Sequence, residues 1–268
     1  MSSAYVHGYG PSEVERLRTQ AATLAELLHA DTAYPAGALV LEAGCGVGAQ
    51  TVALAARSPH AHFTSIDQSA ASIAQAQAAV AAAGLTNVVL QQADIFNLPF
   101  AQRSFDQVFL SFVLEHLSRP LDALTALRDI MKPGGTITVI EGDHGSAYFH
   151  PDSAYARRVI DYQVALQAGS GGDALIGRRL YPLLLDAGLA APTVSPRMVY
   201  VDASKPAMAD RFTRRTFAAM IEAVRAQAID AGLISPADFD RGIADLYRTA
   251  AADGVFCYTF FKAVAVKR

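Results

Sequence analysis

A glycine-rich loop between an apolar run and a helix carries the residues best suited to bind a ligand. Residues 40–49 read VLEAGCGVGA, with glycines at positions 44, 46 and 48. Glycine lets the backbone turn tightly and lets a ligand approach without a Cβ in the way, and the start of the next helix offers free N–H groups. Asp67 ends the following expected strand, where a carboxylate accepts hydrogen bonds from ribose hydroxyls. These features predict a site for a nucleoside-bearing cofactor.

Two classes of cofactor fit this loop. Residues 44–49 satisfy the dinucleotide pattern G-x-G-x-x-G/A, so the glycines alone leave a nicotinamide-dependent Rossmann oxidoreductase open. Glu42 favours a cationic ligand and disfavours a pyrophosphate, and Asp94 ends the third strand, where it can bond an adenine amino group. The string K-P-G-G at residues 132–135 lies outside the dinucleotide fingerprint.

The combined strings E-x-G-x-G-x-G, F-D, L-E-H and K-P-G-G, with acidic strand ends, resemble the class I S-adenosylmethionine-dependent methyltransferases over residues 39–141. Within that family the chain looks most like the small-molecule group that includes ubiquinone- and menaquinone-type methyltransferases. The resemblance implies S-adenosyl-L-methionine as cofactor and in-line transfer of its methyl group to a small organic acceptor. A cofactor-binding module of the same fold without turnover stays open as an alternative.

The resemblance also implies roles for single residues. The 44–48 loop would pass under the methionine part of the cofactor, Asp67 would hold the ribose hydroxyls, and Asp94 would bond adenine. Ser111 and Phe112, at the end of the fourth strand, would face the methionine part. The residues expected to bind the cofactor are Glu42, Gly44, Cys45, Gly46, Gly48, Asp67, Gln68, Ala93, Asp94, Ile95, Ser111, Phe112 and Tyr9.

Catalytic candidates lie after the fourth and fifth strands, at the sheet edge where open α/β folds bind ligands. Residues 141–150, EGDHGSAYFH, read as a polar and aromatic connector. His144 is the first candidate to contact or deprotonate the acceptor, because imidazole titrates near working pH, and His116 and Asp143 are further catalytic candidates. No recognised spacing predicts a metal site. The residues expected to bind the acceptor are Glu141, His144, Tyr148, His150, Tyr181, Arg197 and Tyr200.

The elements that position these residues alternate between strand and helix five times up to residue 140. Such alternation predicts an α/β fold with a parallel sheet. The family fold implies a Rossmann-like, seven-stranded, mostly parallel sheet with one antiparallel strand, helices on both faces and helical lid insertions. Helices are expected over residues 152–168, 173–187, 205–231 and 236–252, and strands over 194–201 and 255–266. The expected single domain, 1–268, comprises a helical cover (1–34), a cofactor-binding core (35–141), helical substrate-side insertions (142–192 and 203–253) and the last strands (193–202 and 254–268).

Composition excludes several other functions. Among 268 residues, 22 Lys and Arg face 25 Asp and Glu, for a net charge of −3, which argues against binding nucleic acid by phosphate neutralisation. Cys45 and Cys257 cannot build a disulfide framework, which fits a reducing compartment, and Cys45 is expected to be a small buried residue. No secretory signal or spanning apolar run is visible. We therefore expect a cytoplasmic protein with a small-molecule substrate and neither nucleic acid nor membrane as partner; acceptor, methylated atom and oligomeric state stay open.

Overall fold

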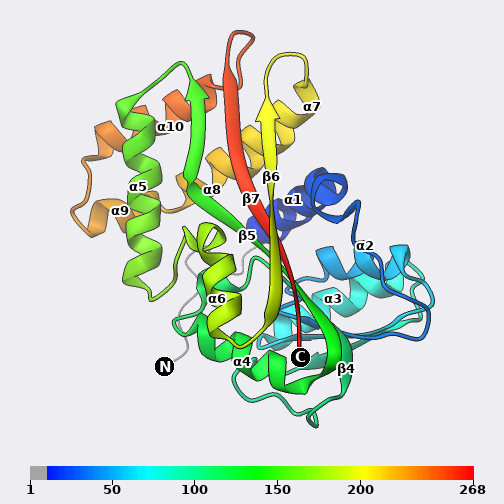
Figure 1. Cartoon of the computed structure of the whole chain (residues 1–268). Coiled ribbons are helices and arrows are strands. Elements are labelled where there is room, and N and C mark those ends of the chain that lie inside the picture. The colour runs from blue at the N-terminus through cyan, green and yellow to red at the C-terminus, as the bar shows by residue number, and fades with distance from the viewer. Residues whose placement is uncertain (1–10) are drawn as a thin grey trace.

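Seven strands form one sheet in the order β3-β2-β1-β4-β5-β7-β6 (Figure 1). The computed structural model describes residues 11–268, with side chains from residue 15 onward. Neighbours from β3 to β5 pair in parallel, whereas β7 runs antiparallel to both β5 and β6. The predicted Rossmann-like sheet with one antiparallel strand is confirmed. The strands are β1 Leu39–Ala43, β2 His62–Asp67, β3 Val88–Gln92, β4 Phe105–Ser111, β5 Met131–His150, β6 Ala190–Val201 and β7 Val255–Val266.

Helices cover both faces of the sheet, which explains the continuous apolar strands. In β1, Val40 packs in one buried cluster with Leu24 and Leu54, while its neighbour Leu41 packs with Leu124 in another. Successive side chains of a strand point to opposite faces, so each face needs its own apolar layer. The helices are α1 Pro11–His29, α2 Ala49–Arg57, α3 Ala70–Ala82, α4 Pro120–Ile130, α5 Ala154–Gly169, α6 Leu180–Asp186, α7 Pro206–Met208, α8 Ala219–Ala223, α9 Arg225–Asp230 and α10 Pro236–Arg248, with turns η1 Leu114–His116, η2 Ile176–Arg179 and the π-type segment η3 Ala209–Ala218.

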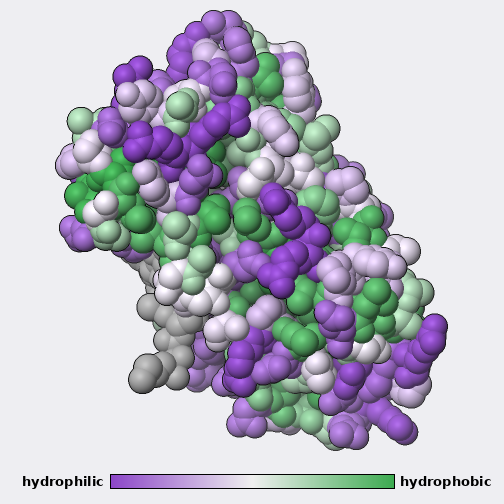
Figure 2. Space-filling model, turned by 60° about the vertical axis from the view of Figure 1, so that its left-hand side comes forward, coloured by the Kyte–Doolittle hydropathy of each residue, from purple (hydrophilic) through white to green (hydrophobic). Residues whose placement is uncertain are grey.

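The second half of the chain extends one end of the sheet. Figure 1 shows β5, β6 and β7 running on past the level of α2 and α3, with α5, α8, α9 and α10 gathered around their far end. On the face shown in Figure 2, hydrophobic patches alternate with hydrophilic ones. Within residues 11–268, every helix is too short or too polar to cross a membrane.

The predicted connector over residues 141–150 is a strand, so assigning residues 142–150 to a helical insertion was wrong. These residues continue β5 and pair with β7, from Glu141 opposite Phe261 to Asp143 opposite Thr259. Pairing resumes at Tyr148 and continues to the end of the strand, which leaves residues 144–147 as a bulge. Polar residues fit inside this strand because distant segments supply their hydrogen-bond partners.

Two helix predictions also needed revision. The helix expected over residues 173–187 begins only at η2, as a tight 3₁₀ turn, before α6. The long helix expected over residues 205–231 divides into α7, η3, α8 and α9, with α8 and α9 meeting at Val224. The remaining predicted elements agree with the structure to within a few residues.

Candidate active site

A cavity of about 780 Å³ lies at the carboxyl ends of the parallel strands. Its wall combines the loops after β1, β2, β3 and β4 with β5, β7, α1 and α8. This is the sheet edge at which the sequence predicted the cofactor. Of the residues predicted to bind the cofactor, those that line the cavity are Gly44, Cys45, Gly46, Asp67, Gln68, Ala93, Asp94, Ile95, Ser111 and Phe112.

The glycine loop is held to β2 by a small network. The N–H groups of Gly44 and Cys45 both donate to the Ile66 carbonyl, at 2.8 and 2.9 Å, and Gly46 N donates to Asp67 Oδ2 at 2.9 Å. Asp67 Oδ1 accepts from Ser69 N at 2.9 Å. Each carboxylate oxygen of Asp67 keeps a second lone pair, so the side chain that fixes the loop can also accept from a ligand.

Gly44 is required by its conformation and by its neighbour. Its φ is +77°, a region that side-chain-bearing residues rarely adopt, and an added Cβ would lie 2.4 Å from Val113 Cγ2. A Cβ on Gly46, by contrast, would meet nothing within 4 Å. The loop therefore packs tightly against Val113, just after β4, and leaves open space beside Gly46.

Two described residues of the predicted cofactor set, Glu42 and Gly48, lie outside the cavity wall. Glu42 is buried beneath the loop, where Thr51 Oγ1 and Ser65 Oγ donate to its Oε2 at 2.6 and 2.7 Å. Burial raises the pKa of Glu42. Its two hydrogen bonds tie β1 to α2 and β2, and Glu42 is not among the residues that line the cavity. Gly48 packs against Ala76 of α3. Tyr9 falls outside the described residues.

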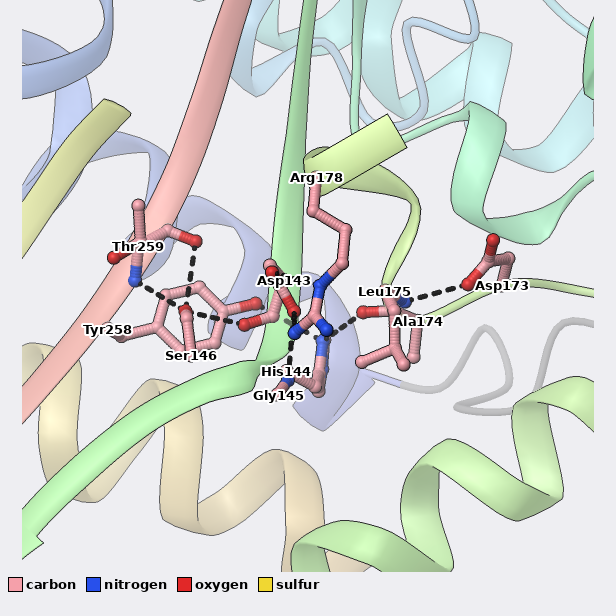
Figure 3. Close-up of polar contacts among 10 residues, drawn as sticks. All are labelled: Asp143, His144, Gly145, Ser146, Asp173, Ala174, Leu175, Arg178, Tyr258 and Thr259. Atoms are coloured by element: carbon pink, nitrogen blue, oxygen red, sulfur yellow. Dashed lines mark hydrogen bonds and ion pairs between the residues drawn. The ribbon is translucent and has the colours of Figure 1, made fainter. Parts of the chain in front are cut away.

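His144 lines the cavity, and its ring is oriented by two contacts (Figure 3). Its Nδ1 lies 3.2 Å from the Ala174 carbonyl oxygen and 3.1 Å from the Tyr258 hydroxyl. A carbonyl oxygen only accepts, so the Ala174 contact favours the tautomer with the ring proton on Nδ1 and the lone pair on Nε2. Nε2 is buried and has no hydrogen-bond partner among the described residues. Burial lowers the pKa of His144, which favours the neutral ring.

The other two catalytic candidates differ in position. His116 lines the cavity, with Nε2 3.6 Å from Glu115 Oε1. Asp143 is absent from the described cavity wall because its carboxylate, 4% exposed, is paired with Arg178. The structure therefore brings His116 and His144 to the cavity and leaves Asp143 behind it.

The predicted acceptor-binding set is dispersed apart from His144. Glu141 is buried and its Oε1 accepts from Val113 N and Leu114 N at 3.0 and 2.8 Å, so it supports the turn after β4. Arg197 pairs with Asp31 at 2.5 Å. The remaining members are solvent-exposed and lie outside the described cavity wall: Tyr148, His150, Tyr181 and Tyr200.

Some residues of the cavity wall were not predicted from the sequence. The Arg119 guanidinium lies 4.7 Å from the centre of the Phe96 ring, and both residues line the cavity. Phe96 follows Asp94 in a turn in which Phe96 N–H donates to Asp94 Oδ1. Because Asp commonly starts such turns, the turn that places Phe96 at the cavity could have been predicted from Asp94 in the sequence. Phe260 and Met220 carry no such signal, because they are single apolar residues in apolar elements. Among the described residues, no cluster of His, Cys, Asp or Glu is suited to hold a metal ion.

Comparison with known proteins matches one segment of the chain to a known family. Residues 40–135 match the family model of a methyltransferase domain. An uncharacterized 37.1 kDa protein of transposon TN4556 from Streptomyces fradiae is 35% identical over 198 residues, which cover 69% of this chain and 54% of that protein. A demethylmenaquinone methyltransferase of Clavibacter sepedonicus is 32% identical over 106 residues, covering 40% of this chain and 42% of that enzyme. The chain thus spans about half the length of these curated relatives.

Solved structures share the fold at low sequence identity. The YcgJ protein of Bacillus subtilis aligns with a TM-score of 0.60 at 17% identity, covering 92% of this chain and 98% of that one. A Haemonchus contortus phosphoethanolamine N-methyltransferase, solved with phosphomonomethylethanolamine and S-adenosylhomocysteine, aligns with a TM-score of 0.55 at 16% identity, covering 92% of this chain and 52% of that one. These similarities confirm the architecture of the sheet and its helices.

Proposed function

We propose that this chain, whose residues 40–135 belong to the methyltransferase domain family, transfers a methyl group from S-adenosylmethionine to a small organic acceptor. One observation carries the proposal: the loops after β1, β2, β3 and β4, all inside the family segment, form one wall of the cavity. His144, from outside that segment, also lines the cavity, and its buried Nε2 has no hydrogen-bond partner among the described residues. The similarity to demethylmenaquinone and phosphoethanolamine methyltransferases supports a small acceptor.

The cavity residues fit this cofactor. Ser111 Oγ and Gln75 Oε1 are buried, belong to cavity-lining residues and have no hydrogen-bond partner among the described residues. Buried polar atoms normally have partners, so a polar ligand at these atoms would satisfy them. Asp67 would hold the ribose hydroxyls and Asp94 the adenine amino group. When bound, the cofactor supplies an electrophilic methyl group on a positively charged sulfur.

The chain's own residues would orient the acceptor and remove its proton. His144 Nε2 would take the proton from an acceptor hydroxyl or N–H as the nucleophile forms, a step that general-base catalysis accelerates by about 10²–10⁴. Leu17 of α1 and Met220 of α8 line the same cavity and would exclude water from it. In-line transfer then depends mainly on holding the acceptor opposite the sulfur.

Transfer of an isotopically labelled methyl group tests this function. The purified chain would be incubated with methyl-labelled S-adenosylmethionine and a panel of small phenols, carboxylates and amines, with S-adenosylhomocysteine as the readout. We expect label transfer to at least one acceptor class. His144→Gln should slow that turnover by about 10²–10⁴ and leave cofactor affinity nearly unchanged.

The matched control is His60→Gln, which replaces an exposed histidine just before β2, at the opposite edge of the sheet. It should behave as the wild type. Failure of the folded protein to bind the cofactor or its demethylated product would overturn the proposed function. Wild-type turnover by His144→Gln would overturn only the role of His144.

A further inference from the structure

The β5 bulge that contains His144 is fastened by an ion pair whose carboxylate is buried. Arg178 Nε donates to Asp143 Oδ2 and Arg178 Nη2 to Asp143 Oδ1, both at 2.7 Å (Figure 3). Gly145 N also donates to Asp143 Oδ1, at 3.0 Å. The Asp143 side chain is 4% exposed, whereas that of Arg178 is 48% exposed. One carboxylate therefore joins both residues that flank His144 to a side chain from η2.

A second set of contacts ties the bulge to β7. Ser146 Oγ donates to the Asp143 carbonyl at 2.7 Å and accepts from Thr259 N at 2.9 Å. The side chain of Ser146 thus replaces the regular strand pairing that is lost between Asp143 and Tyr148. Both ends of the bulge are held, so the backbone of His144 is fixed within it.

The segment that supplies Arg178 also orients the imidazole. The Ala174 carbonyl accepts from His144 N at 3.0 Å and lies 3.2 Å from His144 Nδ1. Ala174 sits in a turn in which Leu175 N donates to Asp173 Oδ1 at 2.9 Å. The stretch 173–178 thus contacts His144 through a carbonyl and its neighbour Asp143 through a guanidinium.

The space around the ion pair is closely filled. A Cβ added to Gly145 would lie 2.4 Å from Arg178 Nη2 and 3.3 Å from Asp143 Oδ1. Only glycine leaves room for the guanidinium at this point. Substituting Gly145 would therefore displace Arg178 without removing either charge.

We infer that Asp143 and Arg178 are positioning residues that keep the proton of His144 on Nδ1 and leave Nε2 as the proton acceptor. The inference rests on the proposed function, because it assigns these residues to the base of that reaction. The ion pair acts in two ways. It fixes the bulge against Ala174, and it neutralises a carboxylate that would otherwise stabilise protonated His144.

The titratable groups around His144 come from three elements. Glu115 and His116 lie on η1, Asp143 lies on β5, and Tyr258 lies on β7. Phe217 of η3 contributes an uncharged ring, with its centroid 6.1 Å from that of His144. Among these groups, Asp143 is the one whose charge is neutralised by a solvent-accessible arginine, Arg178, which can be substituted.

Proton–nitrogen correlation spectra of the histidine rings test this inference on the full chain. Such spectra distinguish the two neutral tautomers and follow protonation with pH, and His144→Gln assigns the His144 signals. We expect the wild type to carry its proton on Nδ1. Arg178→Gln and Gly145→Ala should both increase the Nε2–H population and raise the protonation midpoint of His144 by about one pH unit.

The matched control is Arg225→Gln. Arg225 makes the same two-bond pair with Asp240, at 2.6 and 2.9 Å, on an exposed surface. It should leave the His144 signals unchanged. Arg178→Lys should shift them less than Arg178→Gln, because an ammonium keeps the charge and loses the fork geometry.

Two results would overturn the inference: an Nε2–H tautomer in the wild type, or wild-type His144 signals in both Arg178→Gln and Gly145→Ala. If Arg178→Gln does not fold, Gly145→Ala decides alone. Cofactor affinity, measured by calorimetry in the same samples, should match the wild type in every variant. If the wild type itself does not bind the cofactor, the proposed function is rejected but the tautomer assignment is not.

Discussion

At the residue scale, burial separates the acidic groups that support the cavity wall from those proposed to bind the cofactor. Glu42 and Glu141 are fully buried, and burial raises the pKa of each. Glu42 accepts from two hydroxyls and Glu141 from two backbone N–H groups, so both serve the scaffold. Asp67 and Asp94 line the cavity and keep lone pairs for a ligand.

This division predicts the effect of removing Asp67. Asp67→Ala should weaken S-adenosylhomocysteine binding about tenfold or more, since a hydrogen bond to a charged group contributes about 1.5–3 kcal/mol. Asp67→Asn retains one acceptor oxygen and should fall between the wild type and the alanine variant. Titration calorimetry measures both, with Asp230→Ala, at an exposed carboxylate on α9, as control. A dissociation constant unchanged in Asp67→Ala would reject the ribose assignment.

At the element scale, most of the first half could be predicted from sequence. Apolar runs followed by Gly44, Asp67 and Asp94 mark strands that end at one edge of a parallel sheet, and those residues line the cavity. The second half of β5 could not be predicted in the same way. Its buried polar residues have partners that the local sequence does not reveal: His144 contacts Tyr258, and Asp143 contacts Arg178.

The junction of α1 and α2 gives the protein a predictable sensitivity to acid. His29, at the end of α1, is fully buried, and its Nε2 lies 2.6 Å from Gln50 Oε1. Burial lowers the pKa of His29 from 6.5 to about 4. As pH falls below the ordinary value, the unfolded chain takes up a proton that the folded chain excludes. Stability is therefore lost on acidification through this window.

The expected loss from His29 alone is about 2 kcal/mol in the free energy of unfolding between about pH 7 and pH 5. Urea unfolding across that range measures it, with His29→Gln as the comparison. The burial of neutral His144 adds a loss of the same sign that both proteins share. Equal pH dependence in the wild type and His29→Gln would contradict the assignment.

At the scale of the whole molecule, the two halves of the chain contribute different parts of one cavity. The family segment, residues 40–135, supplies the loops expected to hold the cofactor. Elements outside it supply His144, Met220 and Phe260, which we propose form the acceptor end. The first contribution could be predicted because its residues follow one another at strand ends. The second depends on tertiary contacts, such as the one between His144 and Tyr258, 114 residues apart.

The most direct test of this account is calorimetric titration of the purified, folded chain with S-adenosylhomocysteine. We predict saturable one-to-one binding that an excess of a nicotinamide dinucleotide does not reduce. Absence of binding, or displacement by the dinucleotide, would contradict the claim that the cavity at this sheet edge holds a sulfur-based methyl donor.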